Sequence, residues 1–153
     1  MKITLYTLAH RFRGMKEIAG EKDQPFIVWC HSLCGLGIDQ PDETPWCSSW
    51  LNGLAFLLGL PRSESAAARS WLEVGKPVFA DEARPEFDVV VFKRGPDPQP
   101  GPEVTRGAPG HVGLFAGEDT NGEILVLGGN QGNTVSIQRF PANRLLGIRR
   151  LYD

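Results

Sequence analysis

The order of hydrophobic patterns along the chain constrains its fold more than any other feature. In the first half, apolar residues recur at three- and four-residue spacing, as on one face of a helix. In the second half, short runs rich in β-branched and aromatic residues are separated by turn residues. Helices followed by successive strands predict an α+β domain, in which N-terminal helices pack on one antiparallel β-sheet.

The boundaries of these elements follow from start and stop residues. Proline, threonine and serine mark helix starts, and glycine marks helix ends. The expected helices cover residues 5–19, 25–35, 45–58 and 63–72. The expected strands cover residues 88–93, 111–116, 124–127, 134–138 and 146–151. The run Asp119-Thr120-Asn121-Gly122 predicts a hairpin turn between the second and third of these strands.

Length and composition indicate a single folded domain over residues 1–153, because 41% apolar and 22% charged content suits a globular chain. The net charge of -2 provides no general attraction to nucleic acid. No segment approaches the roughly 20 apolar residues of a membrane helix, so no membrane insertion is expected. Residues 1–13 lack the pattern of a secretion signal, which predicts synthesis in the cytoplasm.

Three cysteines, at positions 30, 34 and 47, form an odd set that argues against a disulfide framework. Cys30 and Cys34 lie four residues apart in an expected helix, so we expect them to be core side chains. Together with His31 they leave open a metal-binding regulator. The other two histidines provide no second ligand pair at a familiar spacing, so we expect no metal and no cofactor.

Cys47 stands where the third helix is expected to begin. With Thr44 as N-cap and Pro45 as the first helical residue, Cys47 becomes the third helical residue. Free N–H groups and the positive end of the helix dipole stabilise a thiolate there, and the thiolate is the attacking form of cysteine. An inert buried thiol is the alternative, and two later residues in the chain favour the reactive thiol.

Two later residues supply a base and an orienting group. His111 begins a strand between two glycines, and Asn130 follows Gly128-Gly129 at the end of the next strand. A histidine can take the thiol proton and return it to a leaving amine. The carboxamide oxygen of Asn130 can hold the far imidazole nitrogen. The order Cys, His, Asn therefore predicts cysteine catalysis at an amide bond.

Two neighbours of these residues are candidates for substrate contacts. Trp46 adjoins the nucleophile, and Gln131 adjoins Asn130 with donors that can reach into a groove. The alternatives are a core tryptophan and a glutamine that completes a turn.

Four sequence blocks resemble those of CHAP-type (cysteine, histidine-dependent amidohydrolase/peptidase) domains, which are relatives of the NlpC-type papain-like enzymes. The blocks are Asp42-Glu43-Thr44-Pro45-Trp46-Cys47, Asp88-Val89-Val90-Val91-Phe92, Gly110-His111-Val112-Gly113 and Gly128-Gly129-Asn130-Gln131. The segment at 145–149 is also similar to the closing strand of phage-associated members. The resemblance spans residues 5–151, with one departure at Phe87, where members often carry glycine.

This resemblance implies a papain-like fold with Cys47, His111 and Asn130 as the catalytic residues. It also implies a polar oxyanion helper upstream of the cysteine, for which Gln40 is the candidate by position. The implied substrate is the peptide part of bacterial peptidoglycan, cut through a thioester by an endopeptidase or an N-acetylmuramoyl-L-alanine amidase.

The implied biological roles are a phage endolysin or an injected antibacterial effector that reaches the bacterial wall or periplasm after release or injection. We expect a monomer, with peptidoglycan as its partner. The alternative is a catalytically inactive wall-binding or virion module of the same fold.

Overall fold

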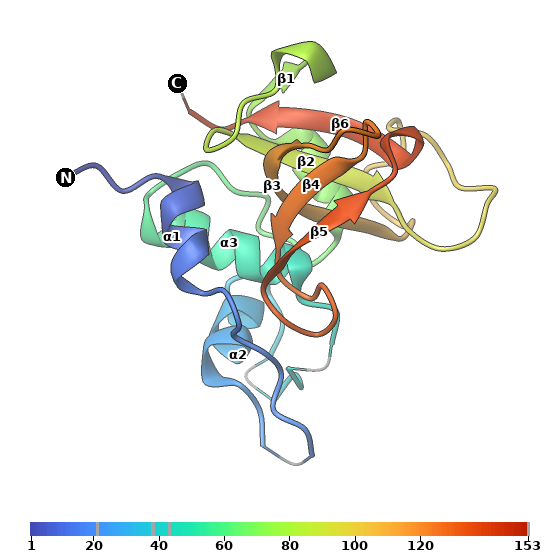
Figure 1. The fold of residues 1–153 in the computed structure, drawn as a ribbon. Coiled ribbons are helices and arrows are strands. Elements are labelled where there is room, and N and C mark those ends of the chain that lie inside the picture. Colours follow the sequence, from blue (N-terminus) through green and yellow to red (C-terminus); the bar gives the residue numbers. More distant parts are fainter. Residues whose placement is uncertain (21, 38, 43, 153) are drawn as a thin grey trace.

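The computed structural model describes residues 1–20, 22–37, 39–42 and 44–152, so Glu43 of the block before Cys47 lies outside the described residues. Figure 1 shows three helices beside one antiparallel sheet of six strands in the order β1-β6-β2-β3-β4-β5. The helices are α1 (Leu5–Arg11), α2 (Pro25–Ser32) and α3 (Cys47–Leu57), with short 3-10 turns η1 (Ala68–Glu73), η2 (Ala80–Glu82) and η3 (Ala142–Arg144). The strands are β1 (Lys76–Val78), β2 (Asp88–Lys93), β3 (Gly110–Glu118), β4 (Ile124–Gly128), β5 (Ser136–Phe140) and β6 (Leu145–Arg150).

The sequence prediction of an α+β fold is confirmed, and all five expected strands are present within two residues of their expected ends. The predicted turn joins β3 to β4, where the Asp119 carboxylate accepts hydrogen bonds from the N–H groups of Asn121 and Glu123. The short edge strand β1 was not anticipated. Its three residues, Lys76–Val78, are too few to show an alternating pattern, and they are defined by pairing with β6.

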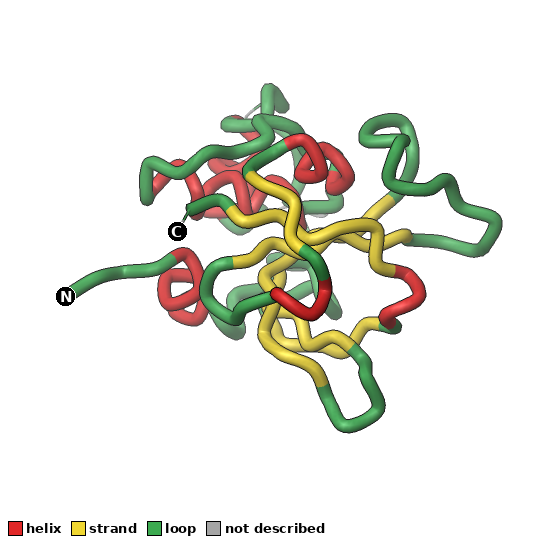
Figure 2. The backbone as a smooth tube through the Cα atoms, turned by 90° about the horizontal axis from the view of Figure 1, so that it is seen from above, coloured by secondary structure: helices red, strands yellow, loops and turns green. Residues whose placement is uncertain are grey.

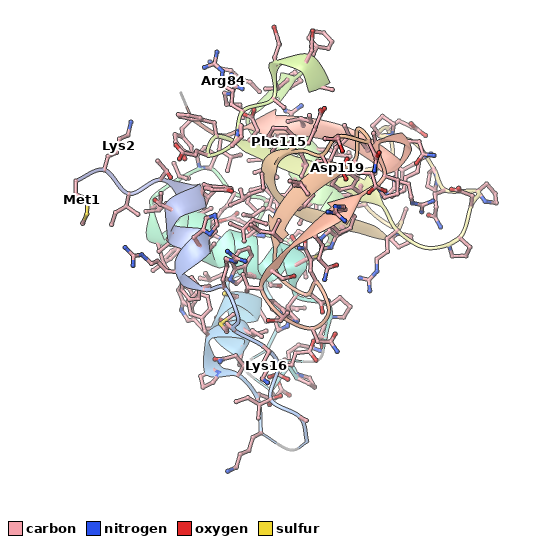
Figure 3. The ribbon with its side chains drawn as sticks, in the orientation of Figure 1. Met1, Lys2, Lys16, Arg84, Phe115 and Asp119 are labelled. Atoms are coloured by element: carbon pink, nitrogen blue, oxygen red, sulfur yellow. The ribbon has the colours of Figure 1, made fainter. Side chains whose placement is uncertain are left out.

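The first helix ends at Arg11 instead of residue 19, which corrects the sequence prediction. Gly14 takes a φ of 88°, and the chain beyond it is drawn into pairing with a distant segment. The N–H of Gly14 donates to the Val135 carbonyl at 2.9 Å, and the N–H of Val135 donates to the Met15 carbonyl at 2.8 Å. Lys16, labelled in Figure 3 on the helical side of the molecule, pairs with Thr134. This tertiary pairing overrides the local helical periodicity.

The hydrophobic core has two parts because both faces of the central strands are covered. Along β2, Val89 and Val91 pack with the helices, whereas Val90 and Phe92 pack with residues of the second cluster. Within the first cluster, α3 contacts β3, α1 contacts β4, and α2 contacts α3. Figure 2 shows the helices (red) and strands (yellow), with both termini on the same side. None of the described helices has the length and apolar content needed to cross a membrane.

Candidate active site

Cys47 is the first residue of α3, and its position corrects the expected helix start. Trp46 is the N-cap, with φ -120° and ψ 9°, so the helix begins two residues later than Pro45. The Trp46 indole N–H donates to Glu17 at 2.8 Å, which anchors this residue outside the helix. As the first helical residue, Cys47 carries a backbone N–H that takes no intrahelical hydrogen bond. Its thiol and N–H therefore both lie at the positive end of the helix.

His111 lies near the start of β3, and its ring is held from two directions. The Nε2 atom lies 2.9 Å from Oε1 of Gln131. The ring stacks on Phe140 with centroids 4.9 Å apart and planes 8° from parallel. His111 also shares a side-chain hydrogen bond with Cys47. Because Gln131 occupies Nε2, Nδ1 is the nitrogen left to face the thiol.

The amide of Gln131 has one possible orientation. Its Nε2 atom donates to the carbonyls of Val126, at 3.0 Å, and Ser136, at 2.8 Å. Its Oε1 atom must then accept the hydrogen bond from His111, so Nε2 of the ring carries a proton. Gly128 makes room for this contact, since a Cβ there would lie 2.4 Å from the Gln131 oxygen. The ring is thus fixed in the tautomer whose Nδ1 can accept the thiol proton.

The structure places the carboxamide of Gln131, the residue after Asn130, within hydrogen-bond distance of His111. Asn130 has a φ of 56°, a left-handed conformation that asparagine tolerates better than most residues. It shapes the turn after β4, and the next residue points its carboxamide at His111. Gln131 is only 3% exposed and its amide is fully used, so it is a partner of the histidine and not the substrate contact that the sequence suggested.

Trp46 occupies the core position that the sequence left open as the alternative to a substrate contact. Its side chain is fully buried, so it offers no surface to a substrate. A Cβ on Gly129 would lie 2.6 Å from its ring, which places the tryptophan against the turn that carries Gln131. Trp46 is therefore a packing residue that joins the nucleophile to the turn after β4.

Gln40, the candidate oxyanion helper, donates to the Thr44 hydroxyl.

The electrostatics of Cys47 and His111 favour a thiolate–imidazolium pair. Burial acts to raise the pKa of the Cys47 thiol, but the hydrogen bond and charge of His111, aided by the Val112 backbone and Arg94, outweigh it and lower the pKa. Burial likewise acts to lower the pKa of His111, but its interactions with Cys47 and Gln131 outweigh burial and raise the pKa. A thiolate is the reactive form of cysteine, so this site activates Cys47.

A cleft of about 370 Å³ opens beside Cys47. It is lined by Pro45, the alanines at 66–68, Arg94 with Gly95, and residues 108–110. Ser48, next to the nucleophile, donates to the Ser65 carbonyl at 2.6 Å and so ties the alanine segment to α3. Apart from Cys47 and Arg94, the lining consists of alanines, prolines and glycines.

Buried Arg69 shapes the loop that runs from β2 to β3 past this cleft. Its Nε atom donates to the Pro109 carbonyl at 2.8 Å. Its Nη1 atom lies within hydrogen-bond distance of the carbonyls of Pro100, Gly101 and Val104. This long loop is coloured yellow in Figure 1 and extends away from the sheet. The sequence contains no local signal for this arrangement, because the contacts span more than 30 residues.

Two solved structures have a similar fold: NlpC1 and NlpC2, both from Trichomonas vaginalis. The fold is NlpC-type and papain-like. NlpC1 aligns with a TM-score of 0.54 and 19% identity over 97% of this chain and 43% of its own. NlpC2 aligns with a TM-score of 0.53 and 18% identity over 97% of this chain and 46% of its own. The chain thus spans less than half the length of either neighbour.

No protein-family model matches the sequence, and no curated protein matches it. The NlpC-type fold is a cysteine-peptidase type of fold. At 18–19% identity, the similarity to these structures describes the fold alone.

The other cysteines lie away from the cleft. Burial raises the pKa of the Cys30 thiol and that of the Cys34 thiol, which disfavours the reactive thiolate form of both. Among the described residues, no group of three or more His, Cys, Asp or Glu side chains is placed to hold a metal ion.

We predict that the two carboxamides after β4 differ in their effect on rate. Gln131→Ala removes a hydrogen bond from the histidine, and a loss of about 1–3 kcal/mol corresponds to roughly tenfold to hundredfold in rate. Asn130→Gly removes a carboxamide but suits a positive φ, so its rate should stay within about threefold of the parent. Initial rates at matched concentrations of folded protein provide the measurement. A slow Asn130→Gly beside a fast Gln131→Ala would return the orienting role to Asn130.

Proposed function

We propose that this chain is a cysteine amidohydrolase of the CHAP and NlpC type that cleaves amide bonds in the peptide part of peptidoglycan. The observation that supports it most is the hydrogen-bonded series from Cys47 through His111 to Gln131, placed at the start of a helix and beside an open cleft. The pairing of thiol, imidazole and carboxamide is the arrangement needed for nucleophilic attack on an amide.

The proposed reaction begins when the Cys47 sulfur bonds to the carbonyl carbon and the carbonyl electron pair moves to oxygen. The N–H of Cys47 donates a hydrogen bond to that oxygen as charge develops. His111 then gives its proton to the nitrogen, the carbon–nitrogen bond breaks, and the amine leaves behind a thioester. In the second half, His111 takes a proton from water, the hydroxide adds to the thioester, and the carboxylic acid is released with return of the Cys47 thiolate.

The proposed role is that of a phage endolysin or an injected antibacterial effector, acting on the bacterial wall or periplasm. The bond cut is that of an endopeptidase or of an N-acetylmuramoyl-L-alanine amidase. A catalytically inactive wall-binding or virion module of the same fold is the second candidate. The activated thiol favours the enzyme, because a purely structural module has no need of a buried, hydrogen-bonded cysteine–histidine pair.

The deciding experiment is digestion of purified peptidoglycan with parent protein and with Cys47→Ala, followed by mass spectrometry of the products. An endopeptidase exposes a new amine and a new carboxyl group within the peptide. An amidase frees the lactyl carboxyl of muramic acid and the amine of alanine. If the parent protein releases no new ends while it still binds the wall, the inactive module is the correct description.

We predict that lysis of peptidoglycan survives EDTA and is lost after alkylation with iodoacetamide. A thiolate mechanism needs no Lewis acid, whereas it does need a free sulfur. The measurement is the lysis rate of one preparation divided between the two treatments. Inactivation by EDTA that zinc restores would instead support a metal-dependent protein built on Cys30, His31 and Cys34.

A further inference from the structure

Arg94 gives the cleft beside Cys47 a positive charge. It directly follows β2 and lines the same cleft as the thiol. The other residues that line this cleft are alanines, prolines and glycines, apart from Cys47 itself. Arg94 is also close enough for its charge to act on both Cys47 and His111. A ligand in this cleft therefore meets the Arg94 guanidinium among small and largely apolar lining residues, beside the Cys47–His111 pair.

The guanidinium of Arg94 differs in its contacts from two other arginines of the chain, Arg69 and Arg144. Arg69 is held by backbone carbonyls, and Arg144 donates to Gly95 and forms an ion pair with Asp97 at 3.2 Å. Arg94 is exposed, and none of the residues that the structure describes gives it a hydrogen bond or an ion pair. Its donors are thus free, and their planar fork matches the two oxygens of a carboxylate.

We propose that Arg94 is a specificity-determining residue that binds a carboxylate of the substrate next to the scissile amide. This inference rests on the proposed function and names the substrate class: an acidic peptide whose free carboxylate lies beside the bond attacked by Cys47. The small residues at 66–68 and 108–110 admit the peptide backbone, and Arg94 selects the anion. A cationic or amidated group at the same place loses this attraction.

The first test needs no peptidoglycan. Iodoacetate and iodoacetamide alkylate the same thiol and are nearly equal in size, but only iodoacetate carries a carboxylate. The measured quantity is the alkylation rate of Cys47 by iodoacetate divided by its rate with iodoacetamide, read by peptide mass spectrometry at low salt. This ratio should fall about threefold or more in Arg94→Gln. The matched control is Arg139→Gln, because Arg139 lies on the edge strand β5 and pairs with Asp119. An unchanged ratio in Arg94→Gln would overturn the proposal.

The second test uses two wall peptides that differ at one group, a free carboxyl or its amide, on the residue next to the cleaved bond. The parent should prefer the free carboxyl by about tenfold to hundredfold in kcat/KM, and Arg94→Gln should lose that preference. Equal cleavage of both peptides by the parent would refute the role of Arg94. Cleavage of neither peptide nor intact peptidoglycan would overturn the proposed function instead, and the alkylation ratio would then decide on Arg94 alone.

Discussion

Replacing Cys47 by alanine should reduce peptidoglycan cleavage by at least about 10⁴-fold, to the background rate. The sulfur forms the bond to the carbonyl carbon, and no other group in the cleft lining is a nucleophile. The side chain is 3% exposed and alanine is slightly smaller, so the fold should be retained. The measurements are product release from purified peptidoglycan and the circular dichroism spectrum.

The matched controls for this variant are Cys30→Ala and Cys34→Ala. Both thiols have raised pKa values through burial, and both should be dispensable for chemistry. Each variant should therefore keep most of the parent activity once corrected for the folded fraction. Wall lysis at nearly the parent rate by folded Cys47→Ala would reject the thiol mechanism.

Replacing His111 by alanine should lower the cleavage rate by about 10²–10⁴-fold, the range of a general acid–base group. It should also move the pH profile of Cys47 alkylation. In the parent, His111 helps to hold the thiol pKa below its ordinary value of 9.0 despite burial. Without the histidine, burial is less opposed and raises the pKa of the Cys47 thiol. The alkylation rate at neutral pH should therefore fall, and the increase of this rate with pH should occur at higher pH. Rates of iodoacetamide labelling from pH 5 to 10 test this.

His10→Ala serves as the matched histidine control, because His10 lies on α1 and makes an edge-to-face contact with Tyr6 outside the cleft. Its labelling profile should overlay that of the parent. If His111→Ala keeps the parent profile, the thiol is activated by the helix start and Arg94 alone, and His111 is not its base.

The strands were predictable because their signals are local. β2 combines a β-branched run with an aromatic residue. Asp119 and Gly122 mark the turn between β3 and β4. The first helix was overestimated because its apolar spacing continues past Gly14, where the backbone instead pairs with Val135. Sequence periodicity does not record a contact between residues more than a hundred positions apart. The same limit applies to the loop held by Arg69.

Part of the candidate site could be predicted from local sequence signals. The positions of Cys47 and His111 follow from a helix start and a glycine-flanked strand, and the structure brings the two side chains together. The order Cys, His, Asn assigned the orienting role to Asn130, and Gln131 was expected to contact substrate. In the structure Asn130 has a positive φ, and the carboxamide of Gln131 contacts the histidine. The catalytic roles themselves stay predictions.

The pairing of the segment after α1 has a consequence for where the working unit of this protein begins. The Met15 carbonyl accepts a hydrogen bond from the N–H of Val135, near the turn that carries Gln131. The Glu17 carboxylate accepts one from the indole N–H of Trp46, next to the nucleophile. The short segment from Met15 to Glu17 thus connects the helices to the sheet close to the place where the thiol and the imidazole meet. A fragment trimmed to the recognisable motifs would keep every reactive group and lose the segment that aligns them.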